Sequence, residues 1–436
     1  MSAATVGVLG FAGLFGLMAV GVPVGIAMLI AGLLGLIALT GPTSAAHMLS
    51  GQAFATASYY QLAVLPLFIL MGNLASAAGL SRDLYDAAYR WIGHQRGGLA
   101  GATVVGCAGF AALSGSSIAS AVTMGRVAYP NMRRYGYGGR LSTGSIAAGG
   151  TLGILIPPST GFVLYAILTE QSIGRLFIAG VLPGLLMTAL FLVTIAIFVR
   201  VWSQEGPSGP RSSMRERLVA TRRAAGIFVI VLLTIGGIYT GLFTPVEAAG
   251  VGAFLAAVML IIRRLVSFTT IREVSVDTLR TTGMCFLILI GANVFAPFVS
   301  LSGLPRVVAD GFIASGLGAN GTMLAILALY AVLGMVIEGL SLLVITLPIV
   351  FPIVMALGFD PIWFGVIMVI VLEMGLISPP VGVNCFVVST IAQDVKLETI
   401  FSGVMPFWFA MFVCTLLLLV FPEIALVLPN AMFATP

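Results

Sequence analysis

Charged residues are scarce in this sequence. Only 8% of its 436 residues are Asp, Glu, Lys or Arg, whereas 59% are hydrophobic. Soluble domains carry about 25% charged residues, so this composition excludes a water-soluble enzyme or binding module. The apolar runs extend well past the roughly 10 residues of an outer-membrane strand and show no two-residue alternation. We therefore predict a helical protein with about ten stretches close to the roughly 20 residues that a membrane-spanning helix needs.

Groups suited to metal binding, redox chemistry or proton abstraction are also rare. The four cysteines occur singly within apolar runs and form no CxxC spacing, which favours packing residues over a disulfide or a metal site. The two histidines, His47 and His94, lie in predicted loops. The basic residues, nearly all arginine, gather in a few loops, whereas nucleic acid needs a solvated basic face. We expect no organic cofactor, no nucleic-acid partner and no enzymatic activity.

The sequence divides into two related halves. Prolines recur 222 residues apart, as at Pro157 and Pro379 and again at Pro158 and Pro380. A stretch rich in Pro, Gly, Ser and Arg over 201–223 is the predicted linker, which leaves halves at 1–200 and 224–436. Each half is predicted to hold a paired segment with a polar tip, followed by a helix that two prolines interrupt. The paired segments are 97–132 and 320–357, and the broken helices are 141–168 and 362–391.

The two halves are expected to have opposite orientations in the membrane. Each paired segment returns to the side it came from, so each half crosses an odd number of times. If the linker is cytoplasmic, most arginines fall on the cytoplasmic side, as the positive-inside rule requires, and only Arg175 and Arg306 fall outside. The predicted fold is an all-α polytopic membrane protein of two inverted-topology repeats, each with a re-entrant helical hairpin and a broken helix. Secondary transporters of this design bind substrate near the membrane midplane, where broken helices meet.

The double prolines are predicted to release main-chain oxygens. A helical N–H bonds the carbonyl four residues back, and proline has no N–H. Pro157 and Pro158 therefore release the carbonyls of Gly153 and its neighbour, and the second pair releases those of Gly375 and its neighbour. In hydrocarbon, a carbonyl without a partner costs several kcal/mol. Together with serine hydroxyls at the hairpin tips, these oxygens suggest two symmetry-related Na⁺ sites; helix packing through small residues at proline kinks is the alternative.

The same region is suited to an anion. Four helices are expected to begin near the midplane, where their N-termini carry partial positive charge and free N–H groups. Glu338, beside the second tip, is a candidate for coupling or a structural hydrogen bond, and Glu373 is a second acid in an apolar run. Arg126 could reach the substrate, but a side chain that extends to water is the preferred interpretation. The predicted substrate-binding residues are Ser116, Ser159, Thr160, Ser341 and Asn384.

Two long motifs point to one transporter family. The first is GSSIASAVTMGRVAYPNMRRYGYGGRL, followed by GGTLGILIPPS, and the second is LVITLPIVFPIVMALGFDPIWFGVIMVIVLEMGLISPPVGVN. Through them, and nearly end to end, the sequence resembles the large membrane subunit (DctM-like) of tripartite ATP-independent periplasmic (TRAP) transporters. The resemblance implies an elevator-type, Na⁺-driven importer of a C4-dicarboxylate or other small carboxylate in the bacterial inner membrane. It also implies lipid contacts, a separate DctQ-like small membrane subunit and a DctP-like periplasmic binding protein.

The resemblance further implies a set of Na⁺ ligands, most of them backbone oxygens. Family members often carry Asp near the second tip and Thr before the second Pro-Pro, where this sequence has Glu338 and Ser378. A stand-alone Na⁺/anion symporter of similar architecture, a passive channel and an intramembrane hydrolase with a nucleophile in GSSIAS are the alternatives. Against a hydrolase, the sequence contains neither a GxSxG nor an HExxH motif. The implied Na⁺ ligands are Ser114, Ser117, Gly153, Ile156 and Pro158 in the first half and Gly339, Gly375, Ser378 and Val381 in the second.

Overall fold

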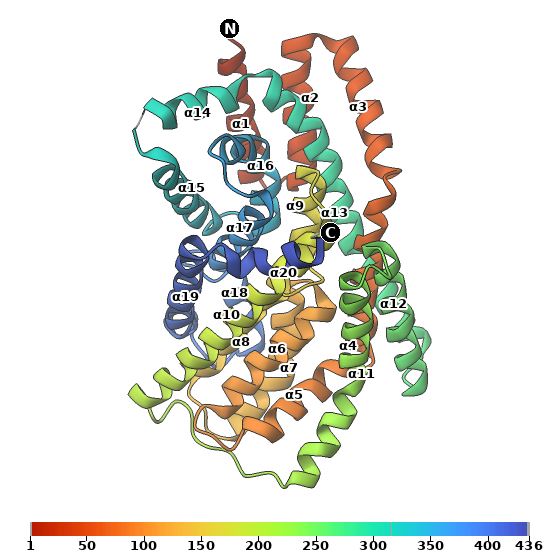
Figure 1. Ribbon diagram of the computed structural model, residues 1–436, viewed down its shortest axis with the longest axis vertical. Coiled ribbons are helices and arrows are strands. Elements are labelled where there is room, and N and C mark those ends of the chain that lie inside the picture. The colour runs from red at the N-terminus through yellow and green to blue at the C-terminus, as the bar shows by residue number, and fades with distance from the viewer. Residues whose placement is uncertain (1, 315, 434–436) are drawn as a thin grey trace.

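The computed structural model describes residues 2–314 and 316–433, and every regular element among them is a helix (Figure 1). Eight helices in this part of the chain are long and apolar enough to cross a membrane. The predicted all-α polytopic membrane fold is therefore confirmed. The first half contains α1 (Ala3–Ala19), α2 (Val24–Thr40), α3 (Pro42–Ala57), the 3₁₀ helix η1 (Tyr60–Ala63), α4 (Val64–Ala77), α5 (Leu80–Ile92), α6 (Gly98–Ser114), α7 (Ser117–Arg134), α8 (Gly139–Leu155), α9 (Thr160–Thr169) and α10 (Ile173–Val201).

The second half repeats the order of elements in the first. The hairpin α6–α7, the broken helix α8–α9 and the long helix α10 correspond to α15–α16, α17–α18 and α19. The second half contains α11 (Met214–Tyr239), α12 (Pro245–Ile262), α13 (Phe268–Leu301), α14 (Leu304–Ala314), α15 (Gly318–Gly334), α16 (Gly339–Ala356), α17 (Pro361–Leu376), α18 (Val383–Ile391), α19 (Leu397–Val420) and α20 (Glu423–Phe433).

Two short helices that the sequence did not predict, α5 and α14, precede the hairpins. Figure 1 shows α5 and the first hairpin in the lower part of the molecule, and α14 with the second hairpin in the upper part. The linker holds the base of the first hairpin: the N–H of Gly97 donates to the carbonyl of Gly206 at 2.9 Å, and that of Gly138 to the carbonyl of Glu205 at 3.0 Å. The tip of α6–α7 therefore points into the interior. Opposite ends for the two hairpins are what the predicted inversion of the halves requires, and the inversion itself stays a prediction.

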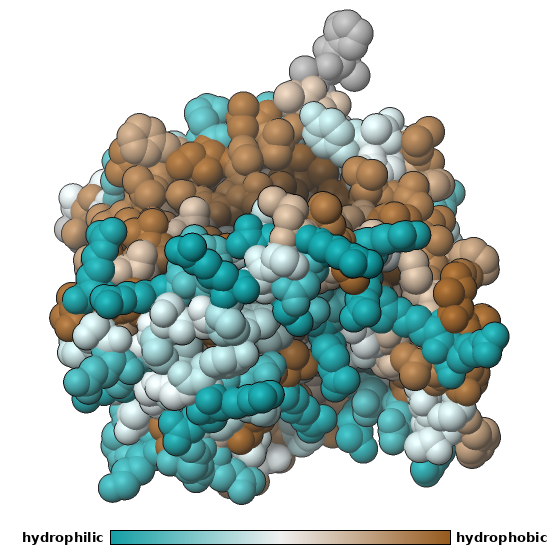
Figure 2. Space-filling view, turned by 90° about the horizontal axis from the view of Figure 1, so that it is seen from below, coloured by the Kyte–Doolittle hydropathy of each residue, from teal (hydrophilic) through white to brown (hydrophobic). Residues whose placement is uncertain are grey.

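Ion pairs tie several elements together at the linker end. Arg263, at the end of α12, lies 2.5 Å from Asp83 of α5. Arg133, at the base of the first hairpin, lies 2.8 Å from Asp394 in the α18–α19 loop, and the Tyr129 hydroxyl donates to the same carboxylate. The hydrogen bond from Tyr129, reinforced by Arg133, holds the pKa of Asp394 below its usual range. Figure 2 shows hydrophilic side chains gathered on this end of the molecule.

The linker is shorter than predicted. It was expected to reach residue 223, but α11 begins at Met214 because Ser213 and Glu216 form a capping box. The Ser213 N–H donates to the Glu216 carboxylate at 2.7 Å, and the Glu216 N–H donates back to the Ser213 hydroxyl at 3.3 Å. A polar, arginine-rich composition therefore did not exclude a helix here.

The first segments of both broken helices lie at the centre of the protein. Every residue of 141–155 in α8 and of 362–376 in α17 is buried. A helix that is apolar or small on all sides is suited to such a position. The first break lies inside the protein, because Pro157 and Pro158 are buried, whereas Pro379, Pro380 and Val381 at the second break are exposed. Main-chain polar groups at the first break therefore need partners within the protein.

Candidate functional site

The first break leaves two carbonyls without a helical donor, as predicted. The last backbone bond at the end of α8 runs from the Ile156 N–H to the Leu152 carbonyl at 3.0 Å. The next two residues, Pro157 and Pro158, have no N–H to offer the carbonyls of Gly153 and Ile154. These oxygens are available to a cation or to water.

The tip of the first hairpin lies directly against this break. The Gly115 carbonyl at the tip accepts from the Thr160 N–H at 3.3 Å and from its hydroxyl at 2.8 Å. A Cβ at Gly153 would lie 2.7 Å from the Ser120 Oγ and closer still to the Ser116 carbonyl, so only glycine permits this approach. The hairpin tip and the break therefore form one compact unit.

Serine hydroxyls at the same tip contact both halves of the protein. The Ser114 and Ser120 hydroxyls lie 2.7 Å apart. The Ser117 hydroxyl donates to the Glu373 carboxylate of α17, and only 1% of Ser117 and 3% of Glu373 are exposed. This contact joins the predicted Na⁺ ligand Ser117 to an acid that we had not assigned to the site.

The second break differs from the prediction in one respect. The Gly375 carbonyl is not left without a partner, because the Ser378 N–H reaches it from three residues along, at 3.0 Å. The prediction assumed hydrogen bonds to the fourth residue back, whereas the last turn of a helix often forms bonds to the third residue back instead. A carbonyl oxygen keeps a second lone pair for a cation. The Ser378 hydroxyl donates to the Met374 carbonyl at 2.6 Å and accepts from the Trp408 indole at 2.8 Å, and Val381 is partly exposed.

The second hairpin tip is capped by its own acid. The Glu338 carboxylate accepts from the N–H groups of Leu340 at 3.1 Å and Ser341 at 2.9 Å, and from the Ser341 hydroxyl at 2.9 Å. Free N–H groups for a substrate anion were expected at this N-terminus. Glu338 occupies them instead, because a carboxylate at this position both accepts the orphan donors and interacts favourably with the helix dipole.

A cavity of about 160 Å³ with a mixed polar and apolar lining lies between the two tips. This is room for about five water molecules. Five predicted site residues line it: Ser114, Ser116, Ser117, Thr160 and Glu338. Four polar residues that were not predicted complete the lining: Asn73 and Ser76 from α4, Thr123 from α7 and Thr281 from α13. For Asn73, the signal was a polar side chain in an otherwise apolar run. The Asn73 amide, for example, donates to the Thr278 hydroxyl of α13 at 3.0 Å.

Three predicted substrate-binding residues do not line this cavity. Ser159 caps α9 by accepting from the Phe162 N–H at 3.2 Å, and Ser341 is bonded to the carboxylate that caps α16. The Asn384 amide donates to the Ala147 carbonyl of α8 at 3.4 Å, and its Oδ1 is buried without a hydrogen-bond partner among the described residues. Their positions within helix caps and helix contacts explain their burial.

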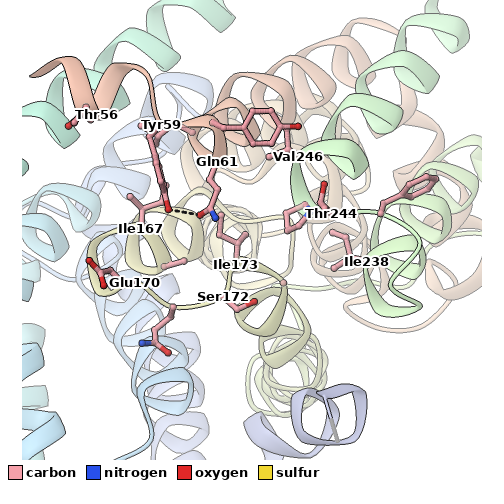
Figure 3. A pocket seen from close by; sticks show the side chains of 18 of the residues that line it. Thr56, Tyr59, Gln61, Ile167, Glu170, Ser172, Ile173, Ile238, Thr244 and Val246 are labelled. Carbon is pink, nitrogen blue, oxygen red and sulfur yellow. Dashed lines mark hydrogen bonds between the residues drawn. The ribbon is translucent and has the colours of Figure 1, made fainter. Parts of the chain in front are cut away.

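A larger cavity of about 980 Å³ lies at the far end of α11 from the linker. Figure 3 shows its lining, drawn from the α3–η1, α9–α10 and α11–α12 connections, with the Tyr59 hydroxyl donating to the Gln61 side chain at 3.0 Å. At 1.5 Å per residue, α11 places it roughly 40 Å from the linker. None of the predicted site residues lines this cavity, because its walls come from loops that only the tertiary structure brings together.

Comparison with known proteins supports the resemblance. Residues 11–424 match the family model described as "Tripartite ATP-independent periplasmic transporter, DctM component". The C4-dicarboxylate TRAP transporter large permease protein DctM of Pseudomonas aeruginosa is 39% identical over 378 residues, covering 86% of this chain and 88% of that protein. The sialic acid TRAP transporter large permease protein SiaM of Vibrio cholerae is 32% identical over 423 residues, covering 96% of this chain and 97% of that protein.

A solved structure shares the fold. The crystal structure of the Alcanivorax borkumensis YdaH transporter aligns with a TM-score of 0.64 at 17% identity, covering 89% of this chain and 90% of that one. Together with the eight candidate spans, these relatives confirm the predicted multi-pass protein of the inner membrane. They also identify a component of a tripartite transporter. The chain belongs to the DctM family, the large permease proteins of TRAP transporters.

Proposed function

We propose that this permease imports a small carboxylate coupled to Na⁺. The observation that carries this proposal is the meeting of a hairpin tip and a proline-broken helix beside a cavity that serine and threonine side chains help to line. Relatives named for a C4-dicarboxylate and for sialic acid transport molecules that both carry carboxylates. The Ser116 hydroxyl lines the cavity and accepts from the Ala119 N–H at 3.4 Å, so its own proton can be donated to a carboxylate. The Thr160 hydroxyl also lines the cavity, but it donates its proton to the Gly115 carbonyl.

Na⁺ is proposed to bind at both breaks. At the first, the Gly153 carbonyl and the Ser114 and Ser117 hydroxyls supply oxygens, together with Ile156 and Pro158. At the second, the remaining lone pairs of the Gly375 carbonyl and the Ser378 hydroxyl serve, together with Gly339 and Val381. Neutral oxygen ligands suit a hard cation. We expect no catalytic step, and the serines of GSSIAS form the hairpin tip.

An elevator movement is proposed from the way the helices pack. In the outer layer, α2 lies along α13 and α4 lies along α12, so helices of different halves interlock. A Cβ at Gly25 would lie 2.6 Å from the Leu287 carbonyl, which shows how closely α2 and α13 approach. These helices are suited to a fixed scaffold. The hairpins and the broken helices would then move together as the domain that carries the cargo.

A binding protein and a small membrane subunit are proposed as partners. If the linker is cytoplasmic, the cavity of about 980 Å³ opens on the periplasmic side, where a binding protein would deliver its ligand. Lipid-facing sides of the scaffold helices would contact the small subunit and the surrounding lipid.

Reconstitution in liposomes tests the proposal. The assay measures uptake of labelled succinate or sialic acid by this chain together with the small subunit and the binding protein encoded beside it. We expect accumulation against a gradient only when all three proteins and an inward Na⁺ gradient are present. Accumulation by this chain alone would instead establish the stand-alone symporter. Flux that only equilibrates the solute, or that ignores replacement of Na⁺ by K⁺, would contradict Na⁺ coupling.

A further inference from the structure

A second polar cavity lies at the linker end of the protein. It has a volume of about 490 Å³ and is lined by residues of α5, of the base of α7 and by Arg223 of α11. Its lining includes Arg82 and Arg90 of α5, Arg126 of α7 and Arg223 of α11. We call this cavity, lined by these four arginines and by Tyr85, the arginine cup.

The acids in the arginine cup do not neutralise its charge. Asp86 lies 3.5 Å from Arg90, and Asp83 lies 2.5 Å from Arg263, which is outside the cup lining. Arg90 also lies 3.3 Å from Glu216. None of the ion pairs among the described residues uses Arg82, Arg126 or Arg223. Arg82, Arg126 and Arg223 are exposed residues, and they line one cavity without an ion pair to an acid among the described residues.

A buried hydroxyl in the same cavity also needs a partner. Tyr85 is 3% exposed, and its hydroxyl oxygen forms no hydrogen bond of ordinary length with the described residues. The Asn131 side chain, which also lines the cup, is the polar group nearest to pairing with it. A buried polar group without a partner is unfavourable, so an acceptor in the cavity would be stabilised by this hydroxyl. An oxyanion is the acceptor that also suits the neighbouring guanidinium groups, which bind carboxylate and phosphate through paired N–H groups.

One face of α7 connects the arginine cup with the cavity at the hairpin tips. Ala119 and Thr123 line the tip cavity, and Arg126 and Pro130 line the cup. Steps of three or four residues keep these positions on one side of the helix, and from Ala119 to Pro130 the rise is roughly 16 Å. The two cavities therefore share a continuous wall, and Arg126 marks the point at which the polar wall becomes charged.

We propose that the arginine cup is an oxyanion-binding site at the inner mouth of the transport path. The ligand is a carboxylate or phosphate group, held by Arg82, Arg126 and Arg223 and by the Tyr85 hydroxyl. The carboxylate of the cargo on its way out and the phosphate of an anionic lipid headgroup share this chemistry. The inference about the cargo rests on the proposed function, whereas the oxyanion site itself does not.

Anion binding to the full chain in phosphatidylcholine nanodiscs tests this site. Equilibrium dialysis at low ionic strength measures binding of labelled succinate and of inorganic phosphate, with choline in place of Na⁺. We expect saturable binding that Arg126→Gln weakens about tenfold and that Arg82→Gln/Arg126→Gln weakens further, because each removes a charge-assisted hydrogen bond. Arg134→Gln, an exposed arginine of α7 outside the cup, is the matched control and should bind as the wild type does.

Tyr85→Phe separates binding from folding. It removes a hydroxyl without a partner in the empty cup, so the unfolding temperature should stay unchanged while anion affinity falls several-fold. Nanodiscs that contain phosphatidylglycerol distinguish the two ligand sources. If a lipid headgroup fills the cup, this lipid will weaken succinate binding in the wild type and not in the double variant. Absence of competition together with succinate binding identifies the cargo.

Two results would overturn the proposal. One is the absence both of Na⁺-independent anion binding and of any effect of phosphatidylglycerol. The other is equal affinity in the wild type and in a folded Arg82→Gln/Arg126→Gln variant. Na⁺-dependent binding reports on the tip cavity instead, so failure of the proposed transport function and failure of the arginine cup give different patterns.

Discussion

The hydrogen bond between Ser117 and Glu373 allows a sharp test of the proposed Na⁺ site. Ser117 is the first residue of α7, and its hydroxyl donates to the carboxylate of Glu373. Only 3% of Glu373 is exposed. The same oxygen keeps a lone pair for a cation beside the Gly153 carbonyl. Ser117→Ala removes both the donor to Glu373 and one of the proposed ligands.

The expected effect follows from the energy of such bonds. A hydroxyl oxygen that binds Na⁺ interacts with a full charge, as a hydrogen bond to a charged group does, and such a hydrogen bond contributes about 1.5–3 kcal/mol. A factor of ten in an equilibrium constant corresponds to about 1.4 kcal/mol. We expect the Na⁺ concentration for half-maximal uptake to rise about tenfold or more in Ser117→Ala. Ser378→Ala should shift it in the same direction, because its hydroxyl stands at the second break between Met374 and Trp408.

Uptake in proteoliposomes as a function of Na⁺ concentration measures this shift. Ser145→Ala is the matched control: Ser145 is fully buried in α8, and its hydroxyl donates to the Ser142 carbonyl at 3.1 Å. It should retain the Na⁺ dependence of the wild type, and thermal unfolding should show that all three variants are folded. If Ser117→Ala and Ser378→Ala both leave the Na⁺ dependence unchanged, the assignment of the cation sites is wrong.

Three further predictions concern other parts of the structure. Gly153→Ala should abolish uptake, because a Cβ would collide with oxygens of the hairpin tip, whereas Gly250→Ala, with nothing within 4 Å of the added carbon, should transport normally in the same assay. Asp394→Asn should lower the unfolding temperature at pH 7. Because its partners hold the pKa of Asp394 below its usual range, the stability that this carboxylate contributes is present above about pH 4 and is lost as the pH falls through the lowered pKa. The unfolding temperatures of the wild type and the variant should therefore converge on acidification. A constant difference between them would contradict this reasoning. The Trp408 indole donates to Ser378, so Na⁺ should change intrinsic fluorescence, and Trp408→Phe should remove that change; an equal response in both proteins would place the second site elsewhere.

The breaks in the two core helices were predictable because proline acts through its own backbone. A missing N–H affects the carbonyl four residues back in any helix, so the disruptions after Gly153 and Gly375 follow from local sequence. The detail at Gly375 did not follow, because the chain after it tightens and supplies the Ser378 N–H. A structural hydrogen bond was one of the two roles considered for Glu338, but its capping of α16 was not predicted, and neither was the capping box of Ser213 and Glu216. Each needs a particular side-chain rotamer as well as a spacing.

The cavity at the tips also combines residues that were predicted from the sequence with residues that were not. Serines of the GSSIAS segment and Thr160 were expected there, and they line it. Asn73, a polar residue in an apolar helix, and Thr281, one of several polar residues in the first half of α13, were not expected. The direction of each side chain depends on how α4 and α13 rotate against the hairpins. The arginines of the cup were read as topology signals, and nothing in their spacing indicates that three elements bring them to one cavity.

Hydropathy, the repeat of prolines and the family motifs by themselves determined that this protein is an all-helical membrane permease with paired hairpins and broken helices. These features depend on short segments, whose preference for lipid or for a helical break is the same in any context. Only the tertiary structure decided which groups meet. Ser117 and Glu373 are 256 residues apart in sequence, and such contacts arise from the packing of whole helices, which no local pattern encodes.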